Sequence, residues 1–415
     1  MIHYSVPGNF MVQYSKRAEP RAVIHGQRAC TIGRVSAYLA SEANPENRRF
    51  FGSLTVTEIR EAKNHMNKKR KNTKKYLSYI LEQTQTLLSI DSPTGYTGDA
   101  INYLCEEYRR LGCEPMVTVK GGLLIDLGGG NAFDALLLEA HTDTLGAMVM
   151  AVKPDGRLKL TPLGGLNPNN AEAENCRVIT REGKKYEGTF QLANASIHVN
   201  DDYDGSKRTF DDMEVVLDEN VNSKEDTEKL GIQPGDIVAF EPRTRITETG
   251  YIKSRFLDDK LSVGILLGYA KWLKEQNITP ERRVFQHITV YEEVGHGACG
   301  TVPEGVTEIL SVDMGCVGGD LNCTERQVSI CAKDSRGPYN YDVVGALIAA
   351  AKEAKLDYAV DIYPYYGSDA DAALNAGHDV KHGLIGAGVY ASHGYERSHR
   401  DGVKNTFELL RTYIK

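Results

Sequence analysis

The sequence predicts an α/β protein with a mixed sheet and helices on both of its faces, interrupted by a small β-rich domain. Apolar runs of strand length alternate with helical patterns over residues 66–146, and the same alternation returns over residues 251–415. Between them, residues 147–250 have short strand patterns punctuated by Gly, Pro, Asn and Asp. We therefore expect one α/β domain formed by the two outer segments, with the middle segment inserted into it.

The N-terminal segment differs from the rest because it has no sustained apolar period that would form a core face. Two interpretations of residues 1–65 stay open: a disordered extension, or a gene-model artefact in which translation starts at Met66. The basic run that follows, residues 68–75, is typical of the solvated start of a helix, and a contact between subunits is the alternative. A helix is expected after this run, on apolar residues at helical spacing: Leu77, Ile80, Leu81, Leu87 and Leu88.

Strands and helices are then predicted in order along the two outer segments. Residues 135–140 are a short apolar run of the kind that forms a buried strand in a parallel sheet. After the inserted segment, helical periodicity predicts helices over residues 261–273 and 342–354, and apolar runs predict strands over residues 284–291 and 309–313. This alternation of element types is what an α/β domain requires.

Charge and composition exclude several classes of protein. A net charge of −7 and a pI near 5.9 argue against a surface for nucleic acids or anionic membranes, which would need clustered Lys and Arg. No apolar stretch reaches the roughly 18 residues of a membrane span, and the N-terminus lacks the pattern of a signal peptide. The eight cysteines are scattered without CxxC pairs, as expected of reduced core thiols. We therefore expect a cytoplasmic protein that binds neither nucleic acid nor membranes.

Four of the predicted strands run into residues of types that commonly bind metal ions. Because ligands bind outside the carboxyl ends of the strands in open α/β sheets, we expect these side chains to converge at one edge. They are His141 after residues 136–140, Glu292 and Glu293 after residues 288–291, Asp313 after residues 309–312, and His393 after residues 388–392.

Asp258 and Asp259 lie in a predicted loop directly before the helix that begins at Leu261. A carboxylate in this place is suited to bridge two cations, and a pair of divalent ions about 3.5–4 Å apart assists hydrolysis by lowering the pKa of a water. Imidazole and carboxylate ligands suit Zn, Co or Mn. Asp143, two residues after His141, is placed to accept the second ring proton of that histidine and to fix its tautomer.

The adjacent residues Glu292 and Glu293 need two different roles, because neighbouring side chains at a strand end point in different directions. We assign Glu293 to the metal and Glu292 to general acid–base catalysis. Each residue alone has an ordinary explanation: a lone histidine is more often a hydrogen-bonded core residue, and an acidic pair before a helix is usually an N-cap. Together they favour a metal site, since burying several carboxylates at one sheet edge without cations would be costly.

Taken in order, these motifs resemble the ligand motifs of the M42 family of dinuclear aminopeptidases, and the resemblance covers about residues 70–415. The matching motifs are His141-Thr-Asp143, Leu257-Asp-Asp-Lys260, Glu292-Glu-Val-Gly295, Val312-Asp313 and Ser392-His393. The resemblance implies a role for each residue: His141 and Asp313 hold one metal, Glu293 and His393 hold the other, Asp258 bridges them, Glu292 is the catalytic base and Asp143 is a supporting residue.

The resemblance also carries expectations about the pocket, the inserted domain and assembly. Gly367-Ser-Asp-Ala370 resembles the Gly-Thr-Asp-Ala element that lines the substrate pocket of the family, which makes Ser368 and Asp369 candidate pocket residues. In the family a small β-barrel-like domain interrupts the catalytic domain and mediates assembly, so we expect a homo-oligomer, with a dodecamer as one form. The segment Ser392–His399 resembles a subgroup associated with synthesis of the osmoprotectant N-acetylglutaminylglutamine amide.

The function expected from this resemblance is that of a metal-dependent aminopeptidase that hydrolyses the N-terminal residue of short peptides. It would use two divalent ions per subunit; Zn is the metal we expect, with Co or Mn as alternatives. Two other functions stay open. One is a dinuclear-metal deacylase or carboxypeptidase acting on a small N-acyl amino-acid derivative. The other is a non-catalytic assembly protein that keeps the fold, which the intact ligand set disfavours.

Overall fold

The computed structural model describes residues 73–414 of the chain. The expected N-terminal extension, residues 1–65, and the basic run up to residue 72 lie outside the described residues. Between residues 73 and 414, no helix has the length and apolar character needed to cross a bilayer.

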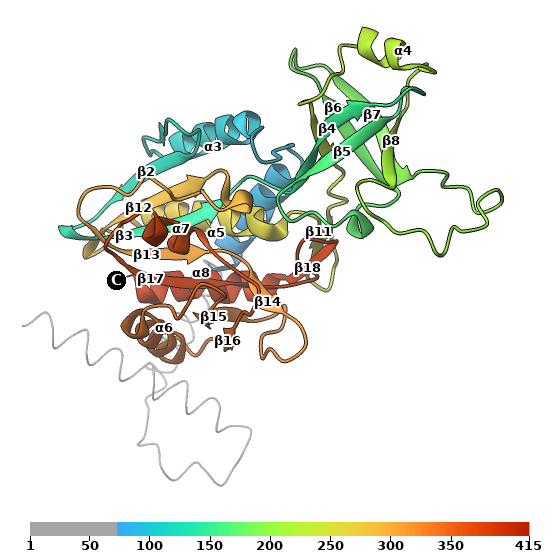
Figure 1. Cartoon of the computed structure of the whole chain (residues 1–415). Helices are drawn as coiled ribbons and strands as arrows, with labels where there is room; N and C mark the ends of the chain where they lie inside the picture. Colours follow the sequence, from blue (N-terminus) through green and yellow to red (C-terminus); the bar gives the residue numbers. More distant parts are fainter. Residues whose placement is uncertain (1–72, 415) are drawn as a thin grey trace, which may run out of the picture. The chain divides into compact units, whose positions relative to one another are not determined.

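The larger domain of the described residues is built on a mixed sheet, as the sequence predicts, and this sheet has twelve strands (Figure 1). Four neighbouring strands at its centre are parallel to one another, and their apolar runs are buried. In spatial order they are β12 (Arg282–Thr289), β3 (Asn131–His141), β13 (Val306–Val312) and β17 (Lys381–Tyr390). The predicted strands at 135–140, 284–291 and 309–313 are therefore confirmed, with ends shifted by a few residues.

The remaining strands extend this centre on both sides. On the β12 side, antiparallel β2 (Leu123–Gly128) and β1 (Met116–Val117) complete the sheet. Beyond β17 it continues through β18 (Glu396–His399), β11 (Tyr251–Ser254) and β10 (Arg245–Ile246). Two more strands, β14 (Gly315–Val317) and β15 (Val328–Lys333), also pair with β17, and β16 (Tyr358–Ile362) pairs with β15.

Helices cover both faces of the sheet. Alternate side chains of strand β3 point to opposite faces and pack against different helices. Leu136 and Leu138 belong to the core formed with α5 and α8, whereas Ala135 and Leu137 pack with Ala370 of α7. The helices are residues 73–88, α3 (Gly98–Arg110), α5 (Leu257–Gln276), α6 (Tyr341–Glu353), α7 (Asp369–Asn375) and α8 (Arg400–Tyr413).

Helix α5, which carries Asp258 and Asp259, is held close to the helix of residues 73–88. A Cβ atom at Gly264 would lie 2.3 Å from the Thr84 hydroxyl, and one at Gly268 would lie 2.3 Å from Ile80 Cγ1. Only glycine permits this approach. Near the start of α5, the buried ammonium of Lys260 donates hydrogen bonds to the carbonyls of Leu87 (2.9 Å) and Ile90 (2.6 Å).

The inserted segment forms a closed six-stranded barrel, which confirms the expected small all-β domain (Figure 1). Inward-facing residues such as Val178, Phe190 and Val238 give it a core of its own. Its strands, in barrel order, are β4 (Gly146–Val152), β5 (Leu158–Leu163), β8 (Met213–Leu217), β7 (Lys185–Leu192), β6 (Glu174–Ile179) and β9 (Ile237–Phe240), and α4 (Lys224–Lys229) is its short helix.

Candidate metal centre

The carboxyl ends of the four central strands bring together the residues singled out in the sequence. His141 is the last residue of β3, and Asp313 directly follows β13. Glu292 and Glu293 lie in a short 3-10 helix, η3 (Glu292–Val294), shortly after β12. His393 lies in the turn between β17 and β18. Parallel neighbouring strands end at the same edge, so residues far apart in the sequence become neighbours.

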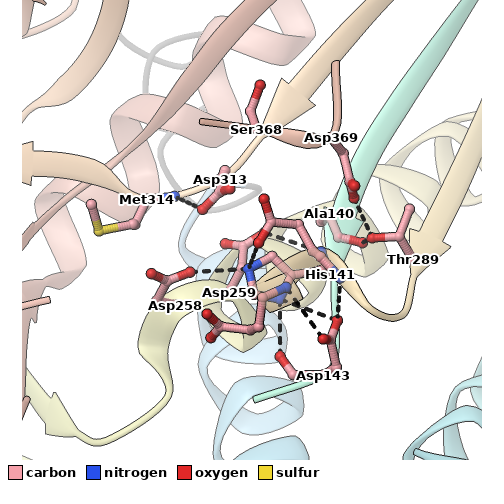
Figure 2. A network of polar contacts seen from close by, with 12 residues as sticks. Ala140, His141, Asp143, Asp258, Asp259, Thr289, Asp313, Met314, Ser368 and Asp369 are labelled. Carbon is pink, nitrogen blue, oxygen red and sulfur yellow. Dashed lines mark hydrogen bonds and ion pairs between the residues drawn. The ribbon is translucent and has the colours of Figure 1, made fainter. Parts of the chain in front are cut away.

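Asp258 lies between the two histidines and faces both. Its Oδ1 is 3.0 Å from His141 Nε2, and its Oδ2 is 3.5 Å from His393 Nε2. Ligand atoms of His141, Asp258 and Asp313 all lie within 4.8 Å of one another. Glu293 Oε2 is 3.6 Å from His393 Nε2. All five predicted metal ligands are therefore brought into one cluster, part of which is shown in Figure 2.

Asp143 supports the cluster in a different way from the one expected. The Nδ1–H of His141 donates to the backbone carbonyl of Asp143 at 2.9 Å, while the Asp143 carboxylate is 3.6 Å away (Figure 2). A carbonyl only accepts, so this bond places the proton on Nδ1 and leaves Nε2 to face Asp258. The Asp143 carboxylate instead accepts hydrogen bonds from the backbone N–H groups of Glu292 (3.1 Å) and Glu293 (3.4 Å). It thereby fixes the turn that carries both glutamates.

The carboxyl groups of the cluster are crowded and removed from water. Burial, followed by the negative charge of Asp258, raises the pKa of Glu293 to about 8 and that of Asp313 to about 7. Burial also raises the pKa of Glu292 well above its usual range. Burial acts in the same direction on Asp258, but its hydrogen bonds with the two histidines hold its pKa below the usual value.

This donor set fits divalent cations. Four carboxylates and two imidazoles meet in one place, where His141, Asp258 and Asp313 are buried and Glu292, Glu293 and His393 are partly buried. In addition, Asp259 Oδ1 is buried beside them with no hydrogen-bond partner among residues 73–414. Bringing such a group of like charges together is costly unless positive charge offsets it. Oxygen and imidazole nitrogen donors of this kind suit Zn, Co or Mn.

A cavity of about 230 Å³ opens beside the cluster. Glu292, Glu293 and His393 line it, and Ser368 also lies on its wall. Asp369 does not line the cavity, because its carboxylate accepts hydrogen bonds from the Thr289 hydroxyl (Figure 2) and from the Ala298 N–H. The wall also contains residues that no sequence motif indicated: Arg336, Tyr365, Tyr366, Asp371 and Asn375.

Comparison with known proteins identifies the family. The sequence profile of the M42 glutamyl aminopeptidases matches residues 121–409. The chain belongs to the M42 family. This confirms the resemblance found in the sequence, and the chain is accordingly a hydrolase that acts on peptides, in a family of metal-dependent aminopeptidases.

Curated relatives match this M42 chain over different lengths. "Putative aminopeptidase YhfE" of Bacillus subtilis is 43% identical over 335 residues, which cover 81% of this chain and 97% of that protein. Lysyl aminopeptidase of Pyrococcus furiosus is 28% identical over 161 residues, covering 39% of this chain and 44% of that one.

Solved structures share the fold at low sequence identity. A TET aminopeptidase from a marine sediment archaeon of the Thaumarchaeota has a TM-score of 0.74 at 19% identity, covering 81% of this chain and 96% of that one. The dodecameric PhTET1 has a TM-score of 0.70 at 21% identity, covering 80% of this chain and 97% of that one. These structures show that the overall fold of this chain is shared with solved aminopeptidases.

Proposed function

We propose that this M42 enzyme removes the N-terminal residue of short peptides with the help of two divalent cations. His141 and Asp313 would hold one ion, Glu293 and His393 the other, and Asp258 would give one oxygen to each. The position of Asp258 carries this proposal, because its two carboxylate oxygens face two different histidines, at 3.0 and 3.5 Å. Bound divalent cations polarise the scissile carbonyl and lower the pKa of a water.

Glu292 is the proposed general base and acid. Its side chain lines the cavity, is 15% exposed, and lies 3.6 Å from His141 Nε2. In this place its carboxylate can take a proton from the attacking water and deliver it to the departing amine. Burial raises the pKa of Glu292, which helps the group to keep the proton between the two steps. Asp143 orients Glu292 through the hydrogen bond to its backbone N–H.

A second candidate function is favoured by one observation. The side chain of Arg336, on the cavity wall, forms no hydrogen bond or ion pair with any residue of the range 73–414. A free guanidinium is suited to bind a carboxylate. The same centre would then serve as a deacylase or carboxypeptidase acting on a small N-acyl amino-acid derivative.

Hydrolysis of aminoacyl p-nitroanilides, compared with hydrolysis of N-acetyl amino acids that keep a free α-carboxylate, distinguishes the two functions. The enzyme is loaded with Zn, Co or Mn, and its metal content is measured by elemental analysis. Cleavage of the free-amine compounds alone, with two metal ions per chain, supports the aminopeptidase. Cleavage of the N-acetyl amino acids alone would establish the second function, and a metal-free protein that cleaves neither set would overturn both.

We also propose that the enzyme forms a closed homo-oligomer. Support comes from relatives, since PhTET1 is a dodecamer and a Pyrococcus horikoshii TET1 peptidase assembles into a tetrahedron or a large octahedral shell. Light scattering should give twelve times the chain mass of 45.8 kDa, or another multiple of it. A mass of 45.8 kDa would overturn this proposal.

A further inference from the structure

We propose that Glu396 is a positioning residue that sets the relative places of Asp258 and His393. Its Oε2 accepts a hydrogen bond from the Asp258 backbone N–H at 3.1 Å, and its Oε1 accepts one from the His393 backbone N–H at 3.0 Å. One carboxylate therefore connects the two turns that carry these residues. The inference rests on the proposed function, because it concerns two of the proposed metal ligands.

Glu396 is placed for this task by strand pairing. It is the first residue of β18 and lies opposite Ser254 of β11, the strand that leads into α5 and Asp258. Glu396 is only 2% exposed, and it makes no ion pair within residues 73–414. A buried carboxylate is costly unless its oxygens are hydrogen-bonded. The hydrogen bonds from the two N–H groups therefore offset the cost of burying Glu396.

Both turns have irregular backbones, so the N–H groups of Asp258 and His393 need hydrogen-bond acceptors from elsewhere in the chain. His393 and Ala391 have φ values of 60° and 58°, and Phe256, just before Asp258, has a φ of 67°. Such left-handed conformations are unfavourable at residues other than glycine and persist only where the surroundings hold them. Neither Asp258 N–H nor His393 N–H lies within a regular helix or strand ladder, so Glu396 satisfies both.

The consequence is a fixed spacing between two side chains that would otherwise move independently. Asp258 comes from the start of α5 and His393 from the turn after β17, yet their side chains lie 3.5 Å apart. Hydrogen bonds that orient a metal ligand typically change metal affinity by about 10–100-fold when they are removed. Glu396 acts on two ligands at once, through their backbones, without touching the cavity.

The test compares Glu396→Gln with a matched control elsewhere in the chain. An amide has only one acceptor oxygen, so Gln satisfies one of the two N–H groups and presents its own NH₂ to the other. The control is Asp361→Asn, because the Asp361 carboxylate also accepts two backbone hydrogen bonds, from Asn322 (2.8 Å) and Cys323 (2.9 Å), and is 5% exposed. Glu396→Asp is a third variant, which keeps the charge and shortens the side chain.

Calorimetric titration of the chelator-treated full chain with Co²⁺ alone gives the metal affinity, and thermal unfolding gives the stability. We expect Glu396→Gln and Glu396→Asp each to bind Co²⁺ about 10–100-fold more weakly, while Asp361→Asn loses stability and keeps its affinity. Unchanged affinity in Glu396→Gln overturns the inference, as does full affinity in Glu396→Asp, which would make charge alone responsible. If the wild-type chain itself binds no Co²⁺, the proposed function fails instead.

Discussion

Replacing Arg336 by Gln should weaken selection for substrates with an acidic N-terminal residue. The guanidinium lies on the cavity wall with no partner among residues 73–414, so it is free to meet a substrate carboxylate. The backbone at this position is held separately, since the Asp334 carboxylate accepts the N–H of Arg336 at 2.7 Å and that of Gly337 at 3.2 Å. The substitution therefore removes charge without moving the loop.

The size of the effect follows from how far Arg336 is exposed. Two unit charges 4 Å apart attract by about 1 kcal/mol in bulk water and about 4 kcal/mol near a protein surface. Because Arg336 is an exposed residue, we expect the lower part of this range, about 1–2 kcal/mol. This corresponds to a loss of roughly 5–30-fold in kcat/KM for an acidic substrate relative to a basic one.

The assay is the ratio of kcat/KM for glutamyl and lysyl p-nitroanilide, measured in the wild-type enzyme and the variant. Arg283→Gln is the control, because it removes the same guanidinium charge near the amino end of β12, away from the cavity, where Arg283 pairs with Asp126. The ratio should fall in Arg336→Gln and stay constant in the control. A constant or rising ratio in Arg336→Gln would refute the electrostatic argument.

Three further predictions concern the centre and its support. Glu292→Gln should lower kcat by about 10²–10⁴-fold while elemental analysis finds the metal content unchanged, and near-normal turnover would show that another group moves the proton. Removal of metal by a chelator should lower the melting temperature in calorimetry, because the crowded carboxylates lose their counter-charge; an ion at 100 times its Kd contributes about 2.7 kcal/mol. An equal melting temperature with and without metal would contradict this. Gly386→Ala should destabilise by about 1–3 kcal/mol or more in denaturant unfolding, because its Cβ would lie 1.6 Å from the Asp313 carbonyl oxygen. Gly345→Ala, in helix α6 with open space around it, should not be destabilised, and equal losses at both sites would count against a steric cause.

The edge of the sheet where the site lies could be predicted from the sequence because it depends on simple periodicity. Continuous apolar runs identified the strands that end near His141, Glu292 and Asp313, and parallel strands in one sheet end at a common edge. The change to short strands with turn residues likewise indicated the barrel. These features are local in the sequence, so a single chain is enough to reveal them.

Contacts that depend on turn geometry could not be predicted in the same way. Glu396 lies three residues after His393, a spacing with no meaning until the turn folds back and brings its carboxylate to Asp258. The direction of the Asp369 side chain was missed for a similar reason. At the start of α7 it could point into the cavity or toward the neighbouring loop, and the hydrogen bond from the Ala298 N–H selects the loop.

The closed barrel shortens the effective loop between two proposed metal ligands that are far apart in the sequence. His141 and Asp258 are 117 positions apart, with the whole barrel between them. Strand β4, which leaves His141, and strand β9, which returns toward Asp258, are paired neighbours in the barrel. Once the barrel has formed, the chain between the two ligands is tethered like a short loop, and most of the entropy of closing it has already been lost. Evolution can therefore enlarge or reshape the barrel's outer loops without lengthening the path between the ligands.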